Sequence, residues 1–271
     1  RSPERKYITL DNVQGNIAFE NVTFKYKNES NNAVDELRIN IRPGEKVGIL
    51  GRIGSGKSTM LKLASGLYDT EKGNVTLDGV DMRQLDPNFL RNQVLLFSQS
   101  PRLFLGTLRE NMDLARTDSY STDQDLLTAL KRFGLDQIIR NHPRGLDMPL
   151  GEDGLGLSGG QKQIIALARM TLRDPKVVLL DEPTTSLDQG TERMALNAIA
   201  HWGRNRTMLL VTHRPQVLQI VNRIIVMENG KVVMDGPRDL VLQKLMQNEQ
   251  NKVKAAQQAQ ENQRPGEAAQ A

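Results

Sequence analysis

The chain has 271 residues, of which 38% are apolar, enough for a sizeable buried core, so disorder throughout is excluded. It contains no cysteine, which excludes disulfides, thiol catalysis and cysteine metal sites. Its 36 basic and 32 acidic residues leave a dispersed net charge of only +4, which does not indicate a nucleic-acid partner.

The first part of the chain has the pattern of strands separated by turns. Residues 17–26 are predicted to form a strand with Val22, Phe24 and Tyr26 on one face. After a second alternating segment, 38–41, and the turn Pro43-Gly44-Glu45, the run 46–50 is short, apolar and followed by glycine, as a buried parallel strand should be. A helix is expected over 57–67 and a further strand over 73–77, which ends at the turn Asp78-Gly79.

A glycine-rich loop lies between the buried strand and the first helix. Its sequence, Gly51-Arg52-Ile53-Gly54-Ser55-Gly56-Lys57-Ser58, fits a phosphate-binding loop, in which the backbone and the helix dipole surround an anion. Lys57 would reach the β- and γ-phosphates of ATP, and the Ser58 hydroxyl would coordinate Mg²⁺. The expected nucleotide ligands here are Gly51, Arg52, Gly54, Ser55, Gly56, Lys57, Ser58 and Thr59. The alternative is a glycine-rich turn that precedes a helix without a ligand.

The middle of the chain, 107–173, changes to a helical pattern. Ser121-Thr122 can cap a helix that Gly134 ends, residues 135–140 favour one or two further turns before Pro143, and a longer helix follows Gly160. Because this helical block separates two blocks of strands, we expect one α/β domain that carries an inserted helical subdomain over about 99–173.

Strand patterns return in the last third. The apolar runs 177–180 and 208–211 are typical of strands covered on both faces. Residues 224–227 and 232–234 flank Asn229-Gly230, a strong hairpin signal. From Asn248 the composition is rich in Gln, Ala, Asn and Glu, so 248–271 is expected to be a solvated, disordered tail, helical at most at its start.

Two carboxylates follow the first of these buried runs. Asp181 and Glu182 would lie at the strand-end edge where open α/β sheets bind ligands. Asp181 is the candidate to hold Mg²⁺ through water, and Glu182 to orient and deprotonate the attacking water. The alternative is that two acidic residues simply begin a loop.

With these motifs in place, the chain resembles the nucleotide-binding domain of an ATP-binding cassette transporter over about residues 15–245. Leu157-Ser158-Gly159-Gly160-Gln161 matches the family signature. The resemblance implies a P-loop NTPase core with a mostly parallel sheet, an N-terminal antiparallel β subdomain and the helical insert. It also implies a head-to-tail dimer in which Ser158, Gly160 and Gln161 meet ATP held by the other copy.

Further residues follow the family order. Gln99 resembles the glutamine that contacts Mg²⁺, and His213 the switch histidine that contacts the γ-phosphate, so the catalytic set would be Lys57, Gln99, Glu182 and His213. Ser186-Leu187-Asp188 resembles the loop that touches the partner copy. Tyr26 stands where the family places an aromatic ring on adenine, although the stripe with Val22 and Phe24 offers core packing as an alternative.

Several segments are similar to bacterial type I secretion ATPases. They are 51–59, Leu77-Asp78-Gly79-Val80-Asp81, Leu85-Asp86-Pro87, Phe104-Leu105-Gly106-Thr107-Leu108-Arg109-Glu110-Asn111 and Thr212-His213-Arg214-Pro215. In addition, Gly151-Glu152-Asp153-Gly154 resembles the short acidic segment that exporter cassettes carry before the signature. This likeness implies ATP-driven export of a polypeptide with a periplasmic adaptor and an outer-membrane channel, at the cytoplasmic face of the bacterial inner membrane. Ile164 and Thr185 depart from the common family pattern. Alternatives are a lipid or small-molecule exporter, a non-transport cassette acting on nucleic acid or ribosomes, and a catalytically dead regulatory cassette.

The domain organisation is expected as follows. Residues 1–14 would be a linker from an upstream membrane domain, because the chain begins with Arg1 and contains no signal segment or apolar run of about 18 residues. Residues 15–247 would be the ATPase domain. Phe104 and Leu105 would face the membrane helices, or else pack locally in the core.

Overall fold

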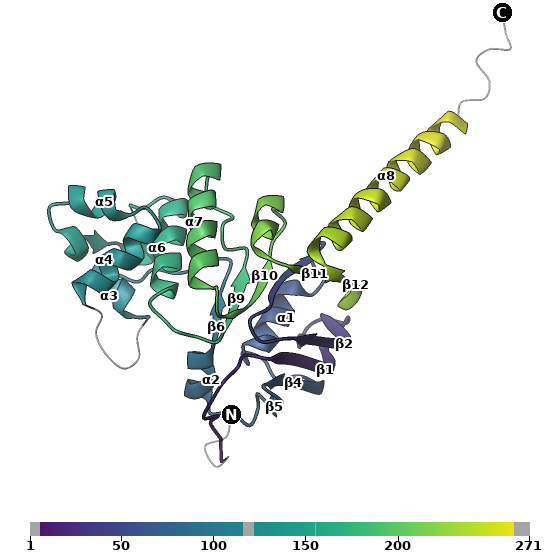
Figure 1. Cartoon of the computed structure of the whole chain (residues 1–271), viewed down its shortest axis with the longest axis horizontal. Coiled ribbons are helices and arrows are strands. Elements are labelled where there is room, and N and C mark those ends of the chain that lie inside the picture. Colours follow the sequence, from purple (N-terminus) through teal and green to yellow (C-terminus); the bar gives the residue numbers. More distant parts are fainter. Residues whose placement is uncertain (1–5, 116–121, 155, 263–271) are drawn as a thin grey trace, which may run out of the picture.

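The structure is a computed structural model that describes residues 6–115, 122–154 and 156–262. Its α/β fold combines a parallel-rich sheet, an antiparallel N-terminal sheet and a group of helices (Figure 1). The fold class expected from the sequence is therefore confirmed. Within the described residues, no helix is long and apolar enough to cross a lipid bilayer.

The central sheet has six strands in the order β12-β11-β3-β10-β9-β6. Its strands are β3 (Lys46–Gly51), β6 (Val94–Phe97), β9 (Val177–Asp181), β10 (Thr207–Val211), β11 (Arg223–Glu228) and β12 (Lys231–Pro237). All neighbouring pairs are parallel except β11 and β12, which form the predicted hairpin at Asn229-Gly230.

Both faces of this sheet are covered, which explains the continuous apolar runs. In β9, Val178 and Leu180 pack into one hydrophobic cluster with the long helices α6 (Gly159–Met170) and α7 (Gln189–Trp202). Val177 and Leu179 pack into the opposite cluster with α1 (Lys57–Ala64) and the antiparallel sheet.

The antiparallel sheet has the order β2-β1-β4-β5. It consists of β1 (Ile17–Phe24), β2 (Val34–Ile41), β4 (Lys72–Leu77) and β5 (Val80–Asp81). β1 ends at Phe24, so Tyr26 lies just beyond the strand expected to include it. The predicted turn at Asp78-Gly79 joins β4 to β5, and both of its residues have positive φ.

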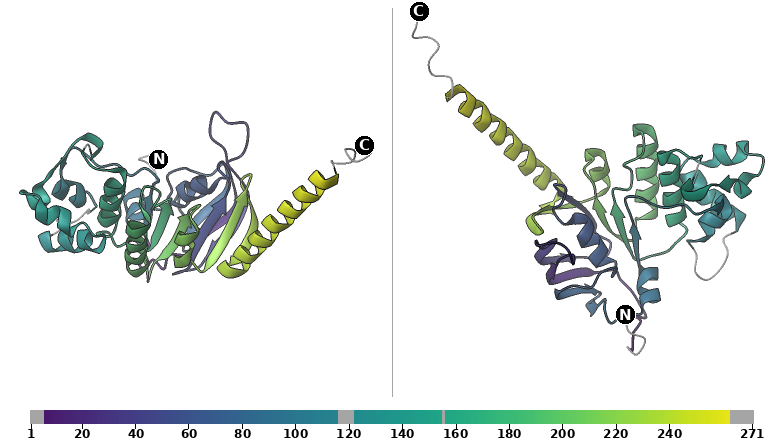
Figure 2. Two further views of the ribbon diagram at one scale, coloured as in Figure 1. Left: turned by 90° about the horizontal axis from the view of Figure 1, so that it is seen from above. Right: turned by 180° about the vertical axis from the view of Figure 1, so that it is seen from behind.

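The inserted helices form their own lobe at one end of the molecule (Figure 2). Besides α6 they are α3 (Leu108–Asp113), α4 (Asp123–Arg132) and α5 (Asp136–Asn141), with the short β7 (Gly106–Thr107) and β8 (Pro149–Leu150). Short 3₁₀ turns span Gly145–Asp147 and Glu152–Gly154, and a third, Pro215–Ile220, follows β10. Thr122 caps α4 as predicted, whereas Ser121 lies outside the described residues.

The C-terminal segment differs from expectation. Helix α8 (Arg238–Asn262) runs through the predicted boundary at 247 and projects from the body of the molecule (Figures 1 and 2). The prediction of a disordered tail is therefore wrong as far as Asn262. Polar composition argues against burial but not against a helix, because Gln, Ala, Lys, Glu and Leu are good helix formers and no Gly or Pro interrupts the segment.

Two further local features depart from the sequence analysis. Residues of the expected linker lie against the domain, since Ile8 forms a parallel bridge with Leu85 and the Asp78 carboxylate accepts the amides of residues 14–16. Helix α2 (Pro87–Gln93) was not expected, although Asp86 at its N-cap and Pro87 at its first turn are standard start signals.

Candidate active site at the strand-end edge

Three neighbouring parallel strands end at the same edge of the central sheet, and each leads into a candidate site segment. β3 leads into the phosphate loop, β9 ends at Asp181, and β10 is followed by His213 after one residue. In the register, Val211 lies opposite both Ile49 and Asp181. Segments about 160 residues apart in sequence are thereby brought together.

The phosphate loop depends on glycine at positions of close backbone approach. Gly51 and Gly56 have φ of 152° and 98°, and a Cβ on them would lie 2.3 Å from the Met227 carbonyl oxygen and 2.2 Å from that of Ala33, respectively. Gly56 is the N-cap of α1 and offers no side-chain acceptor to the helix amides. This backbone geometry suits an anion at the start of α1.

Lys57 lies across the loop rather than pointing away from it. Its Nζ donates to the carbonyl oxygens of Gly51 at 2.9 Å and Arg52 at 2.8 Å. Partial burial lowers the pKa of the Lys57 ammonium, while the nearby charges of Glu182 and Asp181 oppose that shift. The ammonium is thus held where a phosphate would enter the loop.

Asp181 is buried and only partly satisfied. Its carboxylate interacts with the Ser58 hydroxyl, but Oδ1 has no hydrogen-bond partner within the described residues. Burial is the main cause that raises the pKa of this carboxyl above its ordinary value, and the Ser58 hydrogen bond opposes it. A buried oxygen without a donor beside a serine hydroxyl matches the oxygen chemistry that Mg²⁺ prefers, so Ser58 and Asp181 fit this ion.

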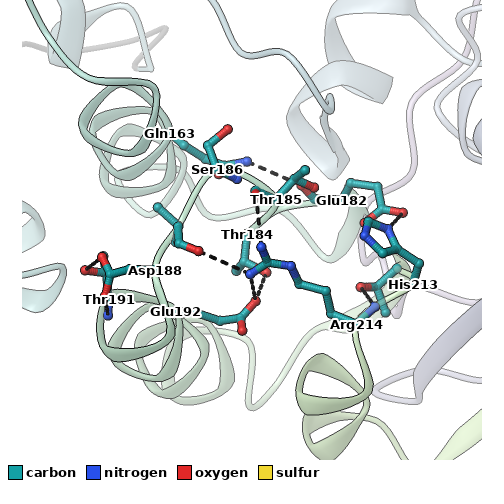
Figure 3. A network of polar contacts seen from close by, with 12 residues as sticks. Gln163, Glu182, Thr184, Thr185, Ser186, Asp188, Thr191, Glu192, His213 and Arg214 are labelled. Carbon is teal, nitrogen blue, oxygen red and sulfur yellow. Dashed lines mark hydrogen bonds and ion pairs between the residues drawn. The ribbon is translucent and has the colours of Figure 1, made fainter.

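Glu182 and His213 contact each other directly. His213 Nδ1 lies 2.8 Å from Glu182 Oε1, and the Glu182 side chain is only 13% exposed against 67% for His213 (Figure 3). Glu182 has a φ of 50°, unusual for a non-glycine residue, and its amide donates to the Val211 carbonyl oxygen of β10. The chain therefore turns sharply after Asp181, and this turn separates the positions of the two adjacent carboxylates.

A set of polar side chains missed by the sequence analysis holds the loop after Glu182. Gln163 of α6 is buried, donates to the Glu182 carbonyl oxygen at 3.3 Å and accepts the Ser186 amide at 2.8 Å. On the other side, Arg214 and Glu192 form an ion pair of 2.8 Å (Figure 3). Arg214 follows His213 directly. The sequence signal that could have indicated its partner Glu192 is a glutamate within the amphipathic helix α7.

The signature segment starts α6 and packs beside the loop after Glu182, since a Cβ on Gly160 would lie 3.1 Å from the Ser186 carbonyl oxygen. Ser158 is the N-cap, and its hydroxyl accepts the Gln161 amide while the Gln161 side chain accepts the Ser158 amide. Ser158 and Gly159 are exposed. Among the residues that the structure describes, no hydrogen bond joins Ser158 or Gln161 to the phosphate loop of the same chain.

The remaining predicted ligands lie at the rim. Gln99 is exposed two residues beyond β6, whose Phe97 pairs with Leu180 of β9. Tyr26 is half-buried, its hydroxyl lies 3.1 Å from the Thr59 hydroxyl of α1, and its ring meets Phe24 and Tyr68 edge to face. Asp188 is exposed and caps α7, and its hydrogen bond with Thr191 lowers the pKa of its carboxyl.

Phe104 and Leu105 are not packed in the core, because their exposed fractions are 55% and 78%. Phe104 lines a hollow of about 410 Å³, together with Arg102, Arg169 in the last turn of α6 and Arg173 beyond the end of that helix. Burial lowers the pKa of both Arg169 and Arg173. The alternative of local core packing for this apolar pair is therefore wrong.

Comparison with known proteins gave consistent matches. The family model "ABC transporter" matches residues 34–185. The ATP-dependent lipid A-core flippase of Neisseria gonorrhoeae is 38% identical over 242 residues, which is 89% of this chain and 39% of that protein. The leukotoxin translocation ATP-binding protein LktB of a Pasteurella haemolytica-like species is 37% identical over 245 residues, 89% of this chain and 34% of that protein.

Among solved structures, a bacterial Atm1-family ABC exporter with ATP bound superposes with a TM-score of 0.82 at 28% identity. The match covers 90% of this chain and 42% of that one. The chain thus spans about two fifths of the length of the proteins it matches.

Proposed function

The chain belongs to the ABC transporter family, and on that premise we propose that it is the ATP-hydrolysing domain of an exporter, active as a pair of copies with ATP between them. The observation that carries this proposal is the convergence of the phosphate loop, Asp181, Glu182 and His213 at one sheet edge. Ser158 and Gly159 of the signature segment are exposed, and within the described residues no hydrogen bond joins Ser158 or Gln161 to the phosphate loop of the same chain, which supports a site completed by a second copy.

The arrangement assigns a part of the reaction to each residue. Lys57 and the loop amides would bind the β- and γ-phosphates of ATP. Ser58, Gln99 and Asp181 would hold Mg²⁺, which neutralises charge on the phosphates when it is bound. Glu182, with a carboxylate already partnered by His213, would take the proton from the attacking water, and His213 would then contact the γ-phosphate.

The adenine and the partner copy would use the residues at the rim. Tyr26 would stack on the base. The hydrogen bond between its hydroxyl and that of Thr59, two residues after Lys57, supports this role because it places the ring beside the phosphate loop. Ser158, Gly160 and Gln161 would approach the γ-phosphate of the other copy with the positive end of α6. Asp188 would lie at the same interface.

The membrane partner would dock beside the inserted helices. An apolar contact surrounded by basic side chains is supported by two observations. Phe104 and Leu105 are exposed, and the adjacent hollow is lined by Arg102, Arg169 and Arg173. We propose that this face meets membrane helices of the complete protein at the cytoplasmic side of the bacterial inner membrane, with 1–14 as the connection.

The cargo that we propose is a polypeptide, passed to a periplasmic adaptor and an outer-membrane channel. The motifs around Thr212-His213-Arg214-Pro215 and the leukotoxin translocation relative support this proposal. A lipid is the second candidate, which the lipid A-core flippase relatives support equally. With the complete gene, restored growth of a flippase-depleted strain would favour the lipid, and adaptor-dependent appearance of a polypeptide in the medium would favour the first proposal.

The ATPase assignment is tested on the chain itself. Lys57→Ala should lose ATP affinity in a titration with a fluorescent ATP analogue, with Lys46→Ala, at the opposite end of β3, as a control that retains it. The specific activity of the parent should rise with protein concentration, because a pair of copies forms the site. Unchanged binding by Lys57→Ala, or a rate independent of concentration, would contradict the proposal.

A further inference from the structure

Arg214, the residue after His213, joins the His213 loop to the loop that follows Glu182. The proposed chemistry requires these two loops to be held in a fixed relative position. Its Nη1 donates to Glu192 Oε1 at 2.8 Å and to the Leu187 carbonyl oxygen at 3.2 Å. Its Nη2 donates to the Thr185 carbonyl oxygen at 3.1 Å. One guanidinium thus ties the His213 loop to the loop that follows Glu182 and to the first turn of α7 (Figure 3).

The acceptor of this contact is a buried carboxylate. The Glu192 side chain is only 4% exposed, and its Oε1 also accepts from the Thr184 hydroxyl at 2.6 Å. A charge-assisted hydrogen bond stabilises a buried carboxylate, so Arg214 and Glu192 hold each other in one geometry. The planar fork of arginine reaches three acceptors at once, which the single ammonium of lysine does not.

The main chain of Arg214 is constrained as well. Its amide donates to the Thr212 hydroxyl at 3.0 Å, Thr212 is buried, and Pro215 starts the following 3₁₀ turn. Because the backbone of Arg214 is restrained both by the Thr212 hydroxyl and by Pro215, a displacement of the loop 184–187 should displace His213 as well.

The loop is held from its other side by Gln163 of the signature helix, through Ser186 and the Glu182 carbonyl oxygen. Glu182 is therefore connected to α6 by Gln163 and to His213 by Arg214, in addition to the direct contact of 2.8 Å.

We propose that Arg214, paired with Glu192, is a positioning residue that sets His213 against Glu182 and the γ-phosphate of ATP. Its effect belongs to the hydrolysis step and not to nucleotide binding, because within the described part of the chain neither residue forms a hydrogen bond or ion pair with the phosphate loop. The inference rests on the proposed function, since it assumes that Glu182 and His213 serve ATP hydrolysis.

The test uses Arg214→Lys, which keeps the charge opposite Glu192, with Glu192→Gln as a second variant that keeps the acceptor. Both should lower kcat about tenfold or more, because small displacements of catalytic groups carry large rate losses, while KM for ATP changes less than about twofold. The matched control is Arg223→Lys, which removes a comparable arginine fork to Asp235 and Glu45 near the opposite ends of the strands. Its kcat should equal that of the parent.

A double variant distinguishes a role of Arg214 in positioning His213 from a general loss of structural stability. If Arg214 acts through His213, Arg214→Lys should cause no further loss in a His213→Ala background, measured by single-turnover hydrolysis with excess protein. A fold-loss as large as in the parent would overturn the inference. Amide hydrogen exchange at 184–187 and 212–214 gives a readout free of activity, and it should be faster in Arg214→Lys but not in Arg223→Lys.

The outcomes also distinguish this inference from the proposed function. If Glu182→Gln and His213→Ala lose hydrolysis while Arg214→Lys retains the parental kcat, only the positioning role is overturned. If Glu182→Gln and His213→Ala both hydrolyse ATP like the parent, the proposed function itself fails.

Discussion

Replacement of Asp181 by asparagine is expected to stabilise the protein in the absence of nucleotide while it impairs Mg²⁺-dependent hydrolysis. The carboxylate is buried, and its Oδ1 has no hydrogen-bond partner within the described residues. A buried acceptor without a donor costs about 1–3 kcal/mol, and a charge adds to that cost. If asparagine recovers about 1 kcal/mol of this, the melting temperature of a domain of this size rises by about 2–4 °C.

The sign of the pH dependence follows from the same burial. Burial raises the pKa of Asp181 in the folded protein, so the folded state binds its proton more tightly than the unfolded state does. The ordinary pKa of an aspartate carboxyl is 3.8. As pH rises from this value through the raised pKa of the folded state, ionisation of Asp181 lowers the free energy of unfolding, and above the folded pKa the full destabilisation is present. The advantage of Asp181→Asn should be largest at neutral pH and should shrink toward acidic pH.

The assay is thermal unfolding without nucleotide, together with phosphate release at saturating Mg²⁺–ATP. Loss of a group that holds the ion through water should reduce activity about 10- to 100-fold. Asp78→Asn is the matched control, because both Asp78 oxygens accept backbone amides of residues 14–16, and this variant should melt lower than the parent. A lower melting temperature for Asp181→Asn, or full Mg²⁺-dependent activity, would refute the reasoning.

Two further predictions concern the reacting group and the base-binding ring. Glu182→Gln keeps the size of the side chain and its hydrogen bond to His213. The variant should therefore bind ATP and form pairs of copies, but its kcat should fall about 10²- to 10⁴-fold because the proton acceptor is lost. A rate of phosphate release equal to that of the parent would contradict the assignment. Tyr26→Ala should weaken ATP binding about five- to 150-fold, as expected for loss of stacking worth about 1–3 kcal/mol, whereas Tyr26→Phe should retain binding. Equal affinities of the two Tyr26 variants in a titration would instead indicate that Tyr26 serves only the aromatic cluster with Phe24 and Tyr68.

The sheet and its ligand edge were predictable because local patterns coincide with tertiary requirements. The run 177–180 is apolar throughout since alternate residues pack into two different clusters, and Asn229-Gly230 has the positive φ that a tight hairpin needs. Glycines of the phosphate loop were informative for the same reason, because the backbone of Ala33 and Met227 leaves no room for a Cβ.

What escaped prediction depends on contacts between segments distant in sequence. No periodicity marks Gln163 or Arg214, and only its place inside the amphipathic α7 marks Glu192. The three residues form a network only after α6, α7 and the His213 loop are packed together. For α8, composition was interpreted as a sign of disorder, although its residues favour helical backbone and Val241 in its first turn is buried in the core.

The central claim is that each ATP site is built from two copies, with the phosphate loop of one and the signature of the other. The direct measurement mixes Lys57→Ala with Ser158→Arg, which disables only the signature, and follows phosphate release. Each variant alone should be inactive, and the equimolar mixture should regain about a quarter of the parental rate, since half of random pairs are mixed and each holds one intact site. A mixture as inactive as its components, or full activity of Ser158→Arg alone, would contradict the account.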